Sequence, residues 1–177
     1  MSKAVLMSIQ PKWCELIASG KKTFELRKSF PRWHSLYVPF KVYIYETQGY
    51  SAVPQVYEDG TMIFKGHGQV IGEFVCDYVN NVFPTGLFVG DDRLTVDGNG
   101  DMPLEKYCMT EEQVRAYIGE KKAYGWHISD LVMYDQPKEL SEFRSYNCRA
   151  VIEDGLPMPS HKIERPPQSW MYVEELR

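Results

Sequence analysis

The chain has 177 residues and a mass of 20.6 kDa, which suits one domain with a sizeable core and is short for two ordinary domains. Hydrophobic residues make up 44% and charged residues 25%, so the composition excludes a mainly disordered chain. Apolar runs stay well below the roughly 18 residues of a membrane-spanning helix, and the first residues turn polar too early for a secretory signal. We therefore expect a single cytoplasmic domain over residues 1–177, without a membrane partner.

The net charge of −4 conceals two segments of opposite sign. Residues 12–41 carry seven basic and two acidic side chains, whereas residues 73–112 carry nine acidic and two basic ones. Because salt confines the field of a charged patch to about 10 Å, the basic segment can attract phosphate even on an acidic protein. The pattern favours a small nucleic-acid footprint and disfavours wrapping by a long duplex. An unevenly charged, solvated surface is the alternative interpretation.

The first half of the chain predicts short strands and one helix. Residues 4–9 form an apolar run that is typical of a strand. Residues 11–20 predict a helix, because they begin with proline, end with glycine and carry apolar residues at helical spacing. Residues 23–27 alternate like a strand with one buried face. Residues 42–45 are apolar on both faces, which predicts a strand covered on both sides. Residues 49–68 predict a hairpin or loop.

The second half predicts further strands and a second helix. Residues 70–79 are the longest strand candidate, and residues 84–103 resemble a long irregular insertion rich in glycine and aspartate. A capping box opens a helix over residues 110–119. Residues 125–134 and 169–173 predict the last two strands.

Strands follow strands after residue 41, which disfavours a doubly wound parallel sheet. We expect an α+β fold, a small β-barrel of mixed and mostly antiparallel strands flanked by short helices, with loop insertions near 48–68 and 84–103. Gly72, inside a predicted strand, indicates a bulge or a close approach of another backbone.

Cysteines and histidines are scattered without the spacing of a zinc site or a disulfide framework. We expect reduced thiols, no metal and no other cofactor. The run of aspartate and glycine at 97–101 is similar to a calcium-binding loop, but it lacks the later glutamate, so it predicts a turn. The cysteines are Cys14, Cys76, Cys108 and Cys148.

The stretch GKKTFELRK concentrates polar chemistry on one turn and one strand. Glu25, between the cations Lys22 and Arg27, would stay ionised and could accept hydrogen bonds from a base edge. The planar guanidinium of Arg27 can clamp a phosphate, and Lys21 and Lys28 add positive charge. A surface ion-pair ladder is the alternative, and it would contribute less than about 1 kcal/mol.

Aromatic residues make up 14% of the chain, and four of them are tryptophans. Aromatic side chains beside a basic strand can stack on nucleic-acid bases, and Trp126 and Trp170 are the candidates for that role. Packing in the core is the alternative for each.

The same basic stretch resembles a known family. Gly20, Lys22, Glu25 and Arg27 fit the G-x-K-x-x-E-x-R signature of the ASCH domain, a member of the PUA-like superfamily. The further stretches similar to a bacterial and phage-borne ASCH group are residues 8–13, 70–74, 125–131 and 165–170.

This resemblance implies a PUA-like barrel with a cleft in which the signature residues gather, and a role in binding RNA or modified bases. Some small bacterial relatives are amidohydrolases that remove an acyl group from acetylcytidine with a lysine, a threonine nucleophile and a glutamate, and others have been proposed as ribonucleases. Lys22 matches the catalytic lysine, whereas Glu25 stands at the threonine position and Thr23 lies two residues away. The third position falls near residues 105–107.

We therefore expect a binding module for RNA, a nucleotide or a modified base. Lysine and arginine would hold phosphate, Glu25 would read a base edge, and a tryptophan would stack. The alternative is a hydrolase, either an amidohydrolase or a ribonuclease, with Lys22 and Glu25 as its acid–base pair. A protein-interaction domain with an unknown partner is the third hypothesis. The residues assigned to ligand binding are Lys21, Lys22, Glu25, Arg27, Lys28, Trp126 and Trp170.

Overall fold

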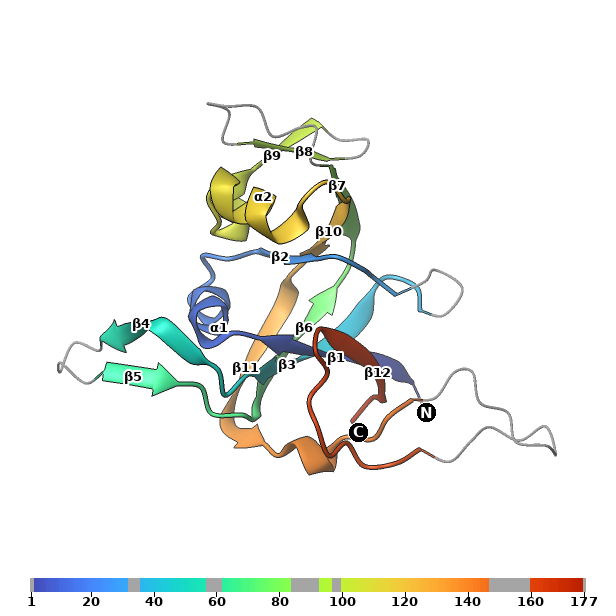
Figure 1. Ribbon diagram of the computed structural model, residues 1–177. Helices are drawn as coiled ribbons and strands as arrows, with labels where there is room; N and C mark the ends of the chain where they lie inside the picture. Colours follow the sequence, from blue (N-terminus) through green and yellow to red (C-terminus); the bar gives the residue numbers. More distant parts are fainter. Residues whose placement is uncertain are drawn as a thin grey trace. The chain divides into compact units, whose positions relative to one another are not determined.

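The computed structural model describes residues 2–31, 36–56, 62–83, 93–96, 100–146 and 160–176 (Figure 1). The chain divides into two compact units. Unit 1 comprises Met1–Glu15, Phe40–Phe74 and Leu131–Arg177. Unit 2 comprises Leu16–Pro39 and Val75–Asp130.

Unit 1 is built on a five-stranded sheet with the order β11-β6-β3-β1-β12. The central strand pair β1 and β3 is parallel, whereas β1 and β12 are antiparallel. Tyr43 and Ile44 of β3 are fully buried, which confirms the predicted strand covered on both sides. The elements are β1 (Lys3–Ile9), β3 (Phe40–Glu46), β6 (Val70–Cys76), β11 (Ser129–Lys138), β12 (Trp170–Glu174), the hairpin β4 (Tyr50–Val56) and β5 (Met62–Lys65), and the 3-10 helix η3 (Leu140–Glu142).

Unit 2 is built on a second five-stranded sheet with the order β2-β10-β7-β8-β9, whose pairings are antiparallel. One face of this sheet packs against α2 and η2 in a core that includes Phe24, Leu26, Tyr107 and Val114. The elements are β2 (Phe24–Arg27), β7 (Val79–Phe83), β8 (Arg93–Val96), β9 (Gly100–Pro103), β10 (Ala123–His127), η2 (Leu104–Tyr107) and α2 (Glu111–Ile118). The helix α1 (Pro11–Ala18) ends in this unit.

Both predicted helices are present, and their ends follow the predicted signals. The Thr110 hydroxyl accepts a hydrogen bond from the Gln113 amide, and the Gln113 side chain accepts one from the Thr110 amide, so the capping box opens α2 as predicted. Gly20 and Gly119 follow the two helices with positive φ angles of 72° and 61°. Glycine is favoured there because it has no Cβ to clash.

Two predicted strands are each divided in the structure. Residues 70–79 form β6 and then β7, separated at Asp77 and Tyr78, so this stretch is not the longest strand. Residues 125–134 form β10 and then the start of β11, separated at Ile128. The strand β11, with ten residues, is longer than both β6 and β7. In each case the two halves belong to different sheets, because the chain changes its pairing partner at the break.

The prediction of an irregular insertion at 84–103 is wrong where the structure describes it. Residues 93–96 and 100–103 pair as the antiparallel hairpin β8–β9, and residues 84–92 and 97–99 lie outside the described residues. The alternation of Leu94 and Val96 with polar residues was obscured by the surrounding glycines and aspartates.

The α+β class and the mixed, mostly antiparallel strands are confirmed. Closure of the sheets into a barrel and the single-domain organisation stay predictions. The close backbone approach at Gly72 is confirmed, since a Cβ there would lie 2.6 Å from the Val132 carbonyl oxygen of β11. None of the helices in the described ranges is long and apolar enough to cross a membrane.

Candidate functional site

The turn after α1 directs Lys22 into unit 2. The Lys22 amide donates to the Leu16 carbonyl at 2.9 Å, and the Thr23 amide donates to the Lys106 carbonyl at 3.0 Å. The strand β2 then alternates, with Phe24 and Leu26 in the core. Glu25 and Arg27 therefore lie on the opposite face of the strand, as predicted.

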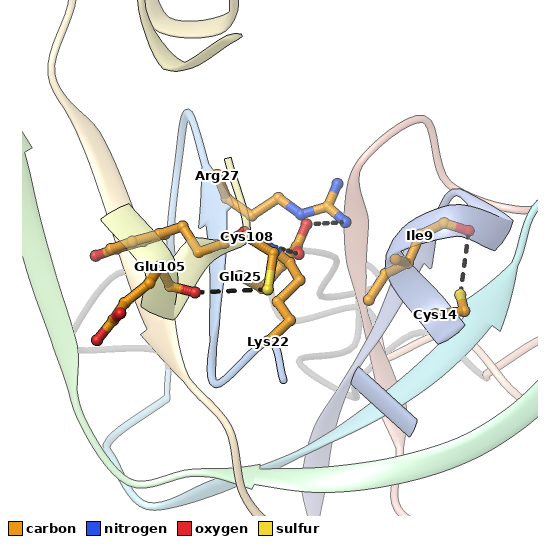
Figure 2. A network of polar contacts seen from close by, with 8 residues as sticks. Ile9, Cys14, Lys22, Glu25, Arg27, Glu105 and Cys108 are labelled. Carbon is orange, nitrogen blue, oxygen red and sulfur yellow. Dashed lines mark hydrogen bonds and ion pairs between the residues drawn. The ribbon is translucent and has the colours of Figure 1, made fainter. Parts of the chain in front are cut away.

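Lys22, Glu25 and Arg27 form a charged cluster (Figure 2). Glu25 Oε1 lies 3.0 Å from an Arg27 guanidinium nitrogen, and Glu25 Oε2 lies 3.4 Å from Lys22 Nζ. Their exposed fractions are 2% for Lys22, 5% for Glu25 and 8% for Arg27. Because the three side chains are buried, the alternative interpretation as a surface ion-pair ladder is excluded. Charged side chains are rarely buried to this extent unless they are paired.

Burial lowers the pKa of Lys22 below its ordinary value, against the raising effect of the Glu25 carboxylate. Lys22 Nζ also donates a hydrogen bond of 2.7 Å to the Tyr107 carbonyl. The amine is therefore fixed in place while its proton is held less tightly than in water.

Two oxygen atoms on the cluster's side of β2 make no hydrogen bond: Thr23 Oγ1, and Glu25 Oε2, which has its ion-pair contact with Lys22. Thr23 directly precedes the strand, and its carbonyl accepts a hydrogen bond from the Ile128 amide. Because alternate residues of a strand share a face, the Thr23 hydroxyl lies on the same side as Glu25. Buried polar atoms are nearly always satisfied in folded proteins, so the Thr23 hydroxyl calls for a partner from a ligand or water. Glu25 Oε2 can accept a further hydrogen bond beside its ion pair with Lys22.

The stretch 105–107, expected to contribute a third catalytic position, contacts the cluster through its backbone. The Tyr107 carbonyl is the contact to Lys22, whereas the Glu105 side chain is exposed. Figure 2 also shows Cys108 beside the cluster, with its thiol donating to the Glu105 carbonyl at 3.5 Å.

The other predicted site residues differ in their burial and come from both units. Trp126 of β10 pairs with Glu25 in the strand register and is fully buried. Lys21 and Lys28 are exposed. Trp170 lies on β12 in unit 1, half-buried, with its ring edge-on to Tyr172 at 5.4 Å between centroids.

Sequence reasoning missed the aromatic neighbours of the cluster. Tyr124 pairs with Arg27 in the register of β10 and β2, two residues before Trp126. The spacing of two between Tyr124 and Trp126 was the available signal, because it puts both on one strand face. Phe30 and Tyr117 gave no comparable signal, since they come from a loop and a helix.

No cluster that could hold a metal ion is found among the described residues, where groups of at least three His, Cys, Asp or Glu side chains were sought. Cys76 is buried, and burial raises the pKa of its thiol to about 12, which disfavours the reactive thiolate form.

Comparisons with known proteins identify the fold of this chain. No family model and no curated protein matches the sequence. A solved structure of ASCH from Zymomonas mobilis is similar with a TM-score of 0.57 and 20% identity, over 97% of this chain and 88% of that chain. The chain has the ASCH fold. A tyrosine-to-phenylalanine mutant of the same ASCH protein matches with a TM-score of 0.58 and 20% identity, over 98% of this chain and 92% of that one.

The resemblance to the ASCH domain is thus confirmed at the level of the fold, over nearly the whole chain. In this ASCH fold, three of the four signature residues are the members of the charged cluster, and the fourth, Gly20, ends the turn that leads to it.

Proposed function

We propose that this chain binds a nucleotide, a modified base or a short single-stranded RNA at the charged cluster. The observation that carries the proposal is the pair Thr23 Oγ1, which has no hydrogen bond, and Glu25 Oε2, which has an ion-pair contact with Lys22 but no hydrogen bond. A buried polar atom without a partner, such as Thr23 Oγ1, costs about 1–3 kcal/mol, and a ligand that bonds to it removes that cost. The Glu25 carboxylate can accept a further hydrogen bond from the same ligand. The amino groups on the edges of cytosine, adenine and guanine are suitable donors, and carboxylates accept from them in nucleic-acid complexes.

The cationic end of the cluster supports a phosphate-bearing ligand. Arg27 is the most exposed of the three charged residues, and the exposed Lys28 follows it directly. Glu25 holds the guanidinium at 3.0 Å, which reduces the entropy lost when a phosphate binds to it. In this proposal the base faces Glu25 and Thr23 while the phosphate meets Arg27 and Lys28, in a cleft beside a PUA-like barrel.

The test is calorimetric binding of CMP, AMP, GMP, UMP and modified nucleosides to the wild type and to Thr23→Val. Valine keeps the shape of threonine, and the lost hydroxyl makes no hydrogen bond, so the variant should fold normally. We expect Thr23→Val to weaken binding about three- to tenfold, the worth of one hydrogen bond. Glu25→Gln should weaken it about tenfold or more, because a bond to a charged group is stronger.

The matched control is Glu111→Gln, which removes a carboxylate paired at 2.7 Å with Arg115 on α2. It should bind as the wild type does. Equal affinities for the wild type, Thr23→Val and Glu25→Gln would reject the proposed site. Thermal stability unchanged by every ligand would reject nucleotide binding, because a ligand at 100 times its Kd should add about 2.7 kcal/mol.

A hydrolase is the second candidate, favoured by the lowered pKa of Lys22. An amine whose pKa is lowered by burial, beside the Glu25 carboxylate, is a candidate general base. With acetylcytidine, activated water would attack the amide carbonyl and the C–N bond would break, which yields acetate and cytidine. Turnover that is lost in both Lys22→Ala and Lys22→Arg would support hydrolysis, since arginine does not release its proton. Wild-type protein that leaves acetylcytidine and single-stranded RNA unchanged would reject it.

A further inference from the structure

Two ring–lysine groups lie around the end of β2 in unit 2, and we call their five side chains the aromatic ledge. They are Lys28, Phe30, Tyr117, Lys122 and Tyr124. We propose that the aromatic ledge is the track on which single-stranded RNA continues beyond the nucleotide held at the charged cluster. This inference rests on the proposed function and specifies its ligand as an oligonucleotide rather than a free nucleotide.

The first part of the ledge is a pair of rings with a lysine. The ring centroids of Phe30 and Tyr124 lie 4.6 Å apart at an interplanar angle of 44°. Lys122 Nζ lies 5.3 Å from the centroid of the Tyr124 ring. Both rings are half-buried and Lys122 is exposed, so the rings are held by packing while the ammonium stays in water.

The second part repeats this arrangement on the helix. Lys28 Nζ lies 5.0 Å from the centroid of the Tyr117 ring, and the Tyr117 hydroxyl accepts a hydrogen bond from the Lys28 backbone. Tyr117 itself is half-buried against the core of unit 2.

The register of the sheet joins the ledge to the charged cluster. Tyr124 is the residue opposite Arg27 in the pairing of β10 with β2, and Lys28 is the next residue along the chain. Directly opposed side chains in an antiparallel pair have Cβ atoms about 4.5–5.5 Å apart. A strand of RNA that places a phosphate at Arg27 therefore reaches the ring of Tyr124 with its next nucleotide.

The chemistry of the ledge fits single-stranded RNA. Bases stack on aromatic rings with about 1–3 kcal/mol each, and lysines contact the phosphates between them. A duplex hides the faces of its bases, so half-exposed rings offer it little. Lys28 and residues 117–124 together include three exposed lysines, at 28, 121 and 122, and one exposed glutamate, Glu120. The local charge therefore attracts a phosphate backbone although the whole chain is acidic.

The test compares a mononucleotide with an oligonucleotide of the same base. Fluorescence anisotropy is measured with labelled hexacytidylate, and CMP binding is measured by calorimetry, for the wild type, Phe30→Ala and Lys122→Glu. We expect the wild type to bind the hexamer at least tenfold more tightly than CMP. Both variants should lose most of this gain while their affinity for CMP stays within twofold of the wild type.

Lys122→Glu affects an exposed residue, so it should fold even if Phe30→Ala does not. It should also make the salt dependence of hexamer binding shallower, by about 0.7 in the log–log slope for each phosphate of a single strand that the variant no longer neutralises. The matched control is Lys138→Glu in unit 1, which removes a lysine 5.3 Å from the Tyr134 ring with the same change in net charge. It should behave as the wild type does.

The outcomes separate the ledge from the nucleotide site. Normal CMP binding with a hexamer gain that Lys122→Glu leaves intact overturns the ledge and leaves the proposed function standing. A hexamer that binds through the ledge while CMP does not bind supports the ledge and overturns the nucleotide site. Wild-type affinities that are equal for CMP and hexamer overturn the ledge. The absence of binding to either ligand overturns both proposals.

Discussion

At the residue scale, Lys22 changes its chemistry on folding. The unfolded chain would hold this proton with the ordinary lysine pKa of 10.5, and burial lowers the pKa in the folded state. Between the two pKa values the unfolded chain binds more protons, so the contribution of Lys22 to stability rises with pH. The difference in free energy of unfolding between the wild type and Lys22→Met should therefore shift in favour of the wild type as pH approaches 10.5.

Urea unfolding of both proteins at pH 7, 8, 9 and 10 measures this difference. A difference that is flat or moves the other way would show that Lys22 remains charged in the folded protein. The comparison uses the difference between two proteins, so titration of the other lysines and tyrosines cancels.

Glu73 gives the opposite pH dependence in unit 1. It accepts hydrogen bonds from Lys41 at 2.8 Å and from the Tyr134 hydroxyl. Burial alone would raise the pKa of Glu73, but these bonds outweigh it and hold the pKa below 4.5. The stabilisation is present above pH 4.5 and is lost as pH falls through the folded pKa.

Glu73→Gln should therefore lower the free energy of unfolding by about 1 kcal/mol at pH 7, since the pair is partly exposed, and by less at pH 3. Chemical denaturation at the two pH values measures the effect. The exposed Glu164 provides the control, and Glu164→Gln should change stability equally little at both. An equal loss for Glu73→Gln at both pH values would contradict the assignment.

At the element scale, the capping box fixes the start of α2 and with it the helix that covers the core of unit 2. Thr110→Ala leaves the Gln113 amide without its acceptor and should cost about 1 kcal/mol. Thr110→Ser keeps the accepting oxygen, so it should lower the free energy of unfolding by only about a few tenths of a kcal/mol. Guanidinium denaturation ranks the three proteins, and an alanine variant as stable as the serine variant would show that water caps the helix equally well.

The contact between β6 and β11 depends on the missing side chain of Gly72. A methyl group there would lie 2.6 Å from the Val132 carbonyl, which is backbone and cannot rotate away. Gly72→Ala should therefore destabilise the protein by about 1–3 kcal/mol through overpacking. At Gly49 an added Cβ would lie no closer than 3.6 Å to another side chain, so Gly49→Ala should change the Tm little. Equal Tm values for the two variants would exclude this close approach.

At the scale of the whole molecule, the sequence indicated the fold class, both helices and the charged cluster. The cluster was predictable because Lys22, Glu25 and Arg27 come from one short stretch with a strand period of two. Its burial was not, since charged residues are ordinarily exposed and what covers them comes from distant segments. The breaks at Tyr78 and Ile128 were missed because apolar alternation continues while the pairing partner changes. The aromatic ledge was missed because a loop, a helix and a strand each contribute one ring.

The interleaving of the two units has a consequence for inheritance of the site. Unit 2 consists of residues 16–39 and 75–130, with a segment of unit 1 between them. The ASCH signature lies entirely in the first piece, whereas the strand opposite Glu25 and Arg27 lies in the second. A gene fragment that encodes the first 39 residues therefore carries the whole signature and none of its partner strand. Recombination between these two pieces would transmit the motif without the strand β10, so the signature and its partner strand are inherited together only when a segment that spans both moves.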